Sequence, residues 1–198
     1  MQGAMAGAGI SFPELDAFAV ASGPGSFTGV RVGLTTVKGL AEVYARPIAA
    51  VSRLLALASL GSAAADWIAS TADAGRGELY AALYCRKDGS LLLHGEECVS
   101  SPGELLSAVA EAVPGGGVLW VSASPNLISS EPGWSMREQL GDRMQAVSPF
   151  LAPAIGRIGY RQVLDGKSVD ALALDANYVR RSDAERFWKD ARRGRHGS

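Results

Sequence analysis

The sequence has few of the residues on which most catalytic and metal sites depend. Its 198 residues include two cysteines and two histidines. Two thiols cannot build a disulfide scaffold, and with no export signal in view we expect a reducing environment and a cytoplasmic location. His94 lies beside a predicted hairpin turn and His196 close to the chain end, so a Ser-His-Asp triad is disfavoured, because a general base needs fixed geometry.

A metal centre has equally little support. Cys85, His94 and Cys98 could supply three ligands across a hairpin, but they contain no Cys-x-x-Cys pair. Two ordinary thiols and a surface histidine are therefore the favoured interpretation.

Long apolar runs are also missing. No stretch approaches the ~18 consecutive apolar residues of a membrane span, although hydrophobic residues make up 47% of the chain and charged residues 20%. That composition is sufficient for a buried core and excludes an intrinsically disordered chain. We therefore expect a globular protein with no membrane partner.

Charge is unevenly distributed, although the formal net charge is only −1. Residues 180–198 contain seven Lys or Arg and three Asp or Glu, whereas residues 1–179 contain 12 and 17. A basic tail can bind nucleic acid. A solvated chain end explains the same pattern, and charge alone favours this second interpretation.

The first part of the chain predicts alternating strands and helices. Between residues 28 and 45, apolar residues recur at spacings of 4, 3, 4 and 3, which predicts a helix with one buried stripe, and Thr28 is its expected N-cap. The stripe consists of Val30, Leu34, Val37, Ala41 and Tyr44. Predicted strands at 16–21 and 47–51 flank this helix, and a further helix follows at 52–60. This alternation is typical of an α/β layer with parallel strands.

The second part of the chain predicts a mixed sheet. Asp88-Gly89 is a hairpin signal between two apolar runs, and Ser101-Pro102-Gly103-Glu104 has the spacing of a capping box at a helix start. The expected strands are 67–71, 78–85, 91–94 and 118–121, and the expected helices are 102–112, 134–140 and 151–164.

Two turns are candidate sites. Residues 23–29 join a strand to a helix, where backbone N–H groups often hold phosphate, but no Lys completes a Walker A loop and Thr28 replaces the third glycine of the dinucleotide fingerprint. A tight glycine turn is the favoured interpretation. The turn with Asp73, Arg76 and Glu78 is either a polar site or a hairpin loop with a weak surface ion pair, and the loop is favoured.

Three segments resemble those of one family, the bacterial tRNA threonylcarbamoyladenosine biosynthesis proteins TsaB, also called YeaZ. The hallmark segment is Gly23-Pro24-Gly25-Ser26-Phe27-Thr28-Gly29, continuing to Leu34. Asp73, Gly77 and Glu78 resemble the second motif of the family, and residues 178–185 resemble its C-terminal segment. The resemblance covers essentially the whole chain, and the first motif is the specific one.

The resemblance implies a fold class. Family members have an α/β fold of the actin/sugar-kinase/Hsp70-like superfamily, with two ribonuclease-H-like lobes. We accordingly expect the remainder of the first lobe at 1–62, the second lobe at 63–181 and a basic tail at 182–198. The family begins with strands that have no counterpart here, so we expect a first lobe truncated at its N-terminus, whose sheet has an exposed edge.

The resemblance also implies a function. Family members are non-catalytic scaffold subunits that bind and support a catalytic threonylcarbamoyltransferase paralogue, with an ATPase subunit joining the complex and tRNA contacted indirectly. We expect no catalytic or metal-binding residue and no cofactor in this chain alone, with ATP and metal in the partner. The expected contact face of helix 28–45, used with the paralogue or in a homodimer, comprises Val30, Arg31, Leu34, Thr35 and Lys38.

Two alternatives remain. The chain could be an enzyme of the same fold, either a glycoprotease-like peptidase or a small ATPase, although it lacks a His-x-x-x-His pair and a matching phosphate loop. It could also be a tRNA-binding module that acts through residues 180–198.

Overall fold

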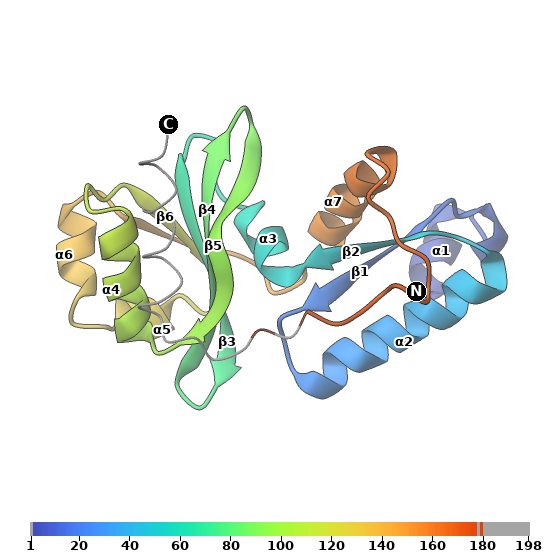
Figure 1. Ribbon diagram of the computed structural model, residues 1–198, viewed down its shortest axis with the longest axis horizontal. Helices are drawn as coiled ribbons and strands as arrows, with labels where there is room; N and C mark the ends of the chain where they lie inside the picture. The colour runs from blue at the N-terminus through green and yellow to red at the C-terminus, as the bar shows by residue number, and fades with distance from the viewer. Residues whose placement is uncertain (1, 178, 180–198) are drawn as a thin grey trace, which may run out of the picture. The chain divides into compact units, whose positions relative to one another are not determined.

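The computed structural model describes residues 2–177 and residue 179, and these divide into two compact units (Figure 1). The first unit combines residues 1–52 with residues 152–177, and the second contains residues 53–151. This division differs from the expected lobes at 1–62 and 63–181, because the helix at 152–164 packs against the first two strands. Residues 182–198, the expected basic tail, lie outside the described part of the chain.

The first unit is a two-stranded parallel sheet with a helix on each face. Strand β1 (Phe18–Gly23) pairs with β2 (Ile48–Ser52), which confirms the predicted parallel layer. Helix α2 (Phe27–Tyr44) packs its buried residues against Phe18 and Val20. Side chains alternate along a strand, so Ala19 points to the other face, where Gly159 of α7 (Ala152–Leu164) meets it.

Short elements precede the first strand. Helix α1 (Gln2–Ala8) leads to a 3-10 turn, η1 (Phe12–Glu14), in which the Glu14 carboxylate accepts a hydrogen bond from the Ser11 N–H at 2.8 Å. The sequence did not predict α1. Among the described residues β1 has no strand neighbour other than β2.

The second unit is a five-stranded mixed sheet of order β5-β4-β3-β6-β7. The strands β3, β4 and β5 are antiparallel, whereas β3, β6 and β7 are parallel. The bounds are β3 Trp67–Gly75, β4 Glu78–Lys87, β5 Ser90–Ser100, β6 Val118–Ser122 and β7 Arg143–Ala146.

Helices cover both faces of this sheet. Figure 1 shows α4 (Pro102–Ala112) and α6 (Trp134–Gln139) on one side and α3 (Arg53–Ala58) on the other. The short helix α5 (Asn126–Ser129) contacts both α4 and α6. Trp120, which is fully buried, packs with Trp134 at the centre of this core. Within the described residues, no helix is long and apolar enough to cross a bilayer.

Most local predictions agree with the structure. Ser101 caps α4 in the predicted capping box, and Asp88 and Gly89 have positive φ values of 50° and 75° at the predicted hairpin. The main correction concerns α2, which begins at Phe27 and is capped by Ser26 rather than by Thr28. Strand β7 was missed because Arg143–Ala146 is short and lies at the sheet edge, where its side chains are at most half-buried.

Candidate functional site

The loop of the first motif begins where β1 ends against the segment near residue 177. Gly23 has a φ of 117°, and a Cβ there would lie 2.8 Å from the carbonyl oxygen of Asn177. The Ser22 carbonyl accepts a hydrogen bond of 2.8 Å from the Asn177 N–H. Only glycine combines this φ with so close an approach, so the first glycine of the motif has a structural role.

The rest of the loop starts helix α2. The Ser26 hydroxyl accepts a hydrogen bond of 3.1 Å from the Gly29 N–H, and a Cβ on residue 29 would come within 2.7 Å of that oxygen. The guanidinium carbon of Arg31 lies 3.6 Å from the centre of the Phe27 ring, which is a cation–π contact. Ser26 and Gly29 therefore act in capping, while Phe27 orders Arg31 at the surface.

Part of the predicted contact face lies on the inner, buried face of α2. Leu34 is only 6% exposed and belongs to the core of the first unit, and Val30 packs against that core. Leu34 is not available to a partner, because it is buried on the stripe that the periodicity predicted. Arg31 and Thr35 are exposed, and Val30 and Lys38 are half-buried, so these four residues remain candidates.

The outer face of α2 carries a second periodic set, which we call the outer seam. It consists of Gly29, Val32, Thr36, Gly39 and Val43, all of them exposed, at spacings of 3, 4, 3 and 4. Val32 and Val43 are 61% and 75% exposed. This spacing places the five residues on one line of the helix, and it is the repeat with which helices pack side by side.

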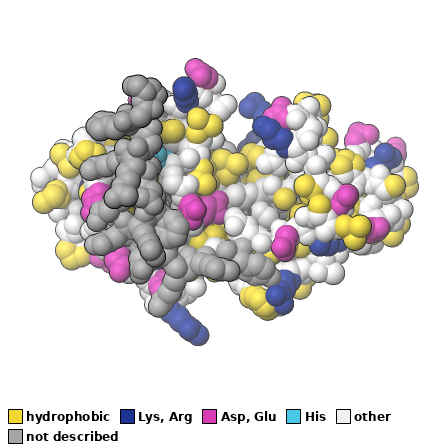
Figure 2. All heavy atoms as spheres, viewed as in Figure 1, with side chains coloured by type: hydrophobic (Ala, Val, Ile, Leu, Met, Phe, Trp, Pro, Cys, Tyr) yellow, Lys and Arg dark blue, Asp and Glu magenta, His cyan; other side chains and the backbone are white. Residues whose placement is uncertain are grey.

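A row of polar residues flanks the outer seam. Arg31, Thr35, Lys38 and Glu42 follow at spacings of 4, 3 and 4. Figure 2 shows hydrophobic side chains at the surface where Figure 1 places α2, with charged side chains of both signs around them. The sequence signal for the seam was available as a second helical periodicity, but its small residues carry no strong hydrophobic pattern.

The second motif forms the turn between β3 and β4, in the second unit. The Asp73 carboxylate accepts a hydrogen bond of 2.7 Å from the Gly75 N–H. Gly75, Arg76 and Gly77 all have positive φ, between 57° and 79°. Asp73 thus stabilises a tight hairpin turn that leads into Glu78, which agrees with the favoured interpretation of this segment as a loop.

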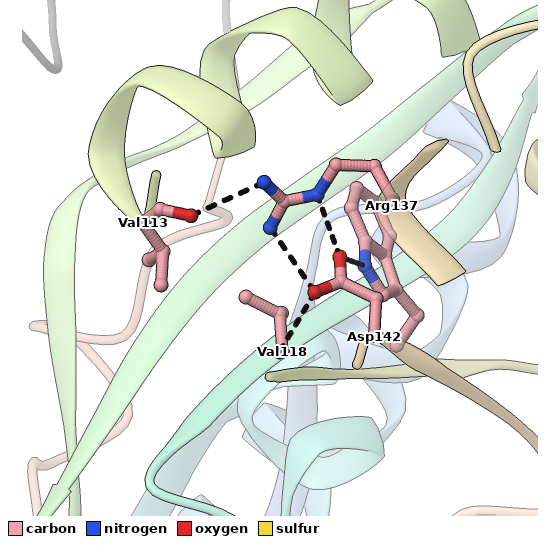
Figure 3. Close-up of polar contacts among 5 residues, drawn as sticks. Val113, Val118, Arg137 and Asp142 are labelled. Carbon is pink, nitrogen blue, oxygen red and sulfur yellow. Dashed lines mark hydrogen bonds and ion pairs between the residues drawn. The ribbon is translucent and has the colours of Figure 1, made fainter. Parts of the chain in front are cut away.

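The sequence did not reveal the buried polar cluster of the second unit (Figure 3). Asp142 pairs with Arg137, with Nε–Oδ2 and Nη2–Oδ1 distances of 2.8 and 3.1 Å. Asp142 also accepts hydrogen bonds from the Val118 N–H at 3.0 Å and the Trp120 indole at 2.9 Å, and Arg137 donates to the Val113 carbonyl at 3.1 Å. Arg137 and Asp142 are 3% and 2% exposed, so the cluster is structural rather than accessible to a substrate.

The Cys98 thiol is not activated. Cys98 is buried, and burial, with a smaller contribution from the Glu97 carboxylate, raises its pKa to about 11. A thiol with so high a pKa stays protonated at neutral pH and is a poor nucleophile. In the part of the chain that the structure describes, no three His, Cys, Asp or Glu side chains are grouped as metal ligands.

Comparisons with known proteins converge on one group. A family model described as TsaD, tRNA N6-adenosine threonylcarbamoyltransferase, matches residues 1–123. The chain is similar to the tRNA threonylcarbamoyladenosine biosynthesis protein TsaB of Bacillus subtilis (strain 168), with 46% identity over 78 residues, which are 39% of this chain and 34% of that protein. It is also 38% identical over 91 residues to the protein of the same name from Escherichia coli (strain K12), covering 45% of this chain and 39% of that protein.

A solved structure extends the likeness. A crystal structure of an uncharacterized protein with similarity to peptidase YEAZ, from Pseudomonas aeruginosa, matches with a TM-score of 0.70 and 28% identity, over 90% of this chain and 80% of that one. This likeness, together with the family match, confirms the expected α/β fold of the actin/sugar-kinase/Hsp70-like class. The matched segments nevertheless span little more than a third of the two curated TsaB proteins.

Proposed function

We propose a function from one premise: this chain belongs to the TsaD family of the tRNA N6-adenosine threonylcarbamoyltransferase model, and is a TsaB/YeaZ-type member of it. On this premise it takes part in tRNA threonylcarbamoyladenosine biosynthesis. Its role is that of a scaffold subunit, which binds and supports a catalytic TsaD-type paralogue.

The observation that carries this proposal is the outer seam of α2. Val32 and Val43 are the large apolar residues of the seam and are mostly exposed, although they belong to a helix whose opposite face is already packed. Apolar side chains in a line at helical spacing are suited to a partner helix, and Gly29 and Gly39 let that helix approach closely. Arg31, held over Phe27, is positioned to meet a carboxylate of the partner.

The remaining parts of the proposal follow from the resemblance to the family. ATP and metal would be bound by the catalytic paralogue, an ATPase subunit would join the complex, and tRNA would be reached through the partner in the cytoplasm. A second copy of this chain could use the same seam. In an antiparallel pairing centred between Thr36 and Val37, Arg31 of one copy would face Glu42 of the other.

The test is co-purification with the TsaD-type paralogue of the same organism. Val43→Asp puts a charge into the outer seam at an exposed position, so it should abolish co-purification without unfolding the chain. Leu172→Asp is the matched control, because Leu172 is an exposed leucine of the same unit, 89% exposed, that does not belong to the outer seam. Equal recovery of the paralogue with both variants would refute the role of the seam.

A functional assay separates the scaffold from the enzyme interpretation. Cells lacking this chain should lose threonylcarbamoyladenosine from their tRNA, measured by mass spectrometry of nucleosides, and the Val43→Asp variant should fail to restore it. ATP or peptide turnover by the isolated chain would favour the enzyme alternative instead.

A further inference from the structure

A groove in the first unit has no role in the proposed function. It has a volume of about 440 Å³ and lies between the C-terminal end of α2, the start of β2 and the segment 168–171. Two backbone hydrogen bonds of 2.8 Å, exchanged between Ile48 and Val169, fix the segment to the strand. The backbone therefore sets the shape of this groove.

Charges of both signs line the groove without neutralising each other. Arg46 lies with Glu42 and Asp170 along it, yet within the described residues no ion pair joins Arg46 to either carboxylate. Oppositely charged side chains that share a groove but do not pair are suited to a ligand that carries both charges itself.

The guanidinium of Arg46, which lines the groove, is held in place. Its Nη2 donates a hydrogen bond of 3.0 Å to the Pro13 carbonyl, and its Nε is buried and closed to the groove. Asp170 is fixed too, because its Oδ1 accepts a hydrogen bond of 2.7 Å from the Ala173 N–H.

The remaining lining is small and mostly apolar. Besides Ser168, it consists of Ala41, Ala45, Pro47, Val169 and Ala171. We propose that this groove binds a small aliphatic zwitterion of the α-amino acid class. The ligand carboxylate accepts hydrogen bonds from Arg46, its ammonium group donates to Glu42 and Asp170, and its side chain lies against the alanines and Val169.

The test is a titration of the full chain followed by NMR at the backbone amides of residues 45, 46 and 168–171. The probes are L-valine, isobutylamine and isobutyrate, because the two analogues keep the aliphatic body and each carry one of the two charges. L-Valine should give saturable shifts, and each analogue should bind about tenfold more weakly for the loss of one charge-assisted contact. No saturation with about 20 mM L-valine, or equal binding of an analogue, would overturn the proposal.

Two variants locate the ligand in the groove. Asp170→Asn keeps an acceptor for the Ala173 N–H but removes the charge, and should weaken L-valine binding by about tenfold. Asp165→Asn is the control, because Asp165 is an exposed carboxylate of the same unit that does not line the groove. Equal affinities of the two variants would place the ligand elsewhere and reject the site.

The L-valine titration tests the groove independently of the proposed scaffold role. Val43→Asp leaves every lining residue of the groove in place, so its L-valine titration should match that of the unmodified chain. If the chain binds the paralogue through the outer seam but binds no L-valine, the inference about the groove is refuted and the proposed scaffold role is not.

Discussion

The buried ion pair of the second unit allows one prediction to be worked in detail. Asp142→Ala removes a carboxylate that receives hydrogen bonds from Arg137, the Val118 N–H and the Trp120 indole. The guanidinium then stays buried, at 3% exposure, without its counter-charge. Breaking such a pair from one side costs about 3–5 kcal/mol, and each donor left without an acceptor costs about 1–3 kcal/mol.

These costs overlap, because they describe the same cluster, so we expect a loss of about 3–5 kcal/mol in the free energy of unfolding. This loss is large against the ~5–15 kcal/mol stability of ordinary domains. Urea denaturation followed by tryptophan fluorescence measures it, since Trp120 is itself part of the cluster.

The chain provides its own control for this experiment. Asp165 and Lys167 form an ion pair with a similar separation, 3.1 Å, but their side chains are 57% and 70% exposed. Solvent screens such a pair, so Asp165→Ala should change stability by about 0–1 kcal/mol. A loss of less than about 1 kcal/mol for Asp142→Ala, or equal losses for both variants, would refute the reasoning from burial.

Three further predictions concern packing and thiol chemistry. Gly159→Ala should lower the free energy of unfolding by about 1–3 kcal/mol, because its Cβ would lie 2.5 Å from the Cβ of Ala19. On the same helix, a Cβ at Gly156 would meet nothing within 4 Å, so Gly156→Ala should be neutral or stabilising. Thermal melts of the two variants measure the difference. At pH 7 a thiol reagent should label the half-buried Cys85 and spare Cys98, whose pKa of about 11 keeps it protonated. Because the folded chain keeps Cys98 protonated to a higher pH than the unfolded chain, the contribution of Cys98 to the free energy of unfolding should be complete below pH 9.0, the ordinary pKa of the thiol. This contribution should be lost as the pH rises towards about 11. Labelling of Cys98 as fast as Cys85 in the folded chain would contradict its burial.

The features that the sequence predicted well are those set by neighbours along the chain. The inner stripe of α2 from Val30 to Tyr44 follows from helical periodicity, and the capping box at Ser101 from a spacing of three residues. Both depend on contacts within a few turns of backbone, which a sequence displays directly.

The features that the sequence missed depend on distant segments. Asp142 accepts from Val118, 24 residues earlier, and no local pattern marks that contact. Leu34 was assigned both to the buried stripe and to the contact face, and the core of the first unit buries it. The outer seam was not predicted, because Gly29 and Gly39 contribute little to a hydrophobic pattern, although their spacing with Val32 and Val43 is regular.

The return of α7 to the first two strands has a consequence for the order of folding during synthesis. Gly159 packs against Ala19 and Ala49, so one face of the first sheet stays uncovered until the helix from Ala152 onwards leaves the ribosome. The intervening residues 53–151 form a unit of their own and can fold while that face waits. At ~5–20 residues per second, a sheet made early spends several seconds with its apolar face open, which is a period when a chaperone or an early partner could act on it.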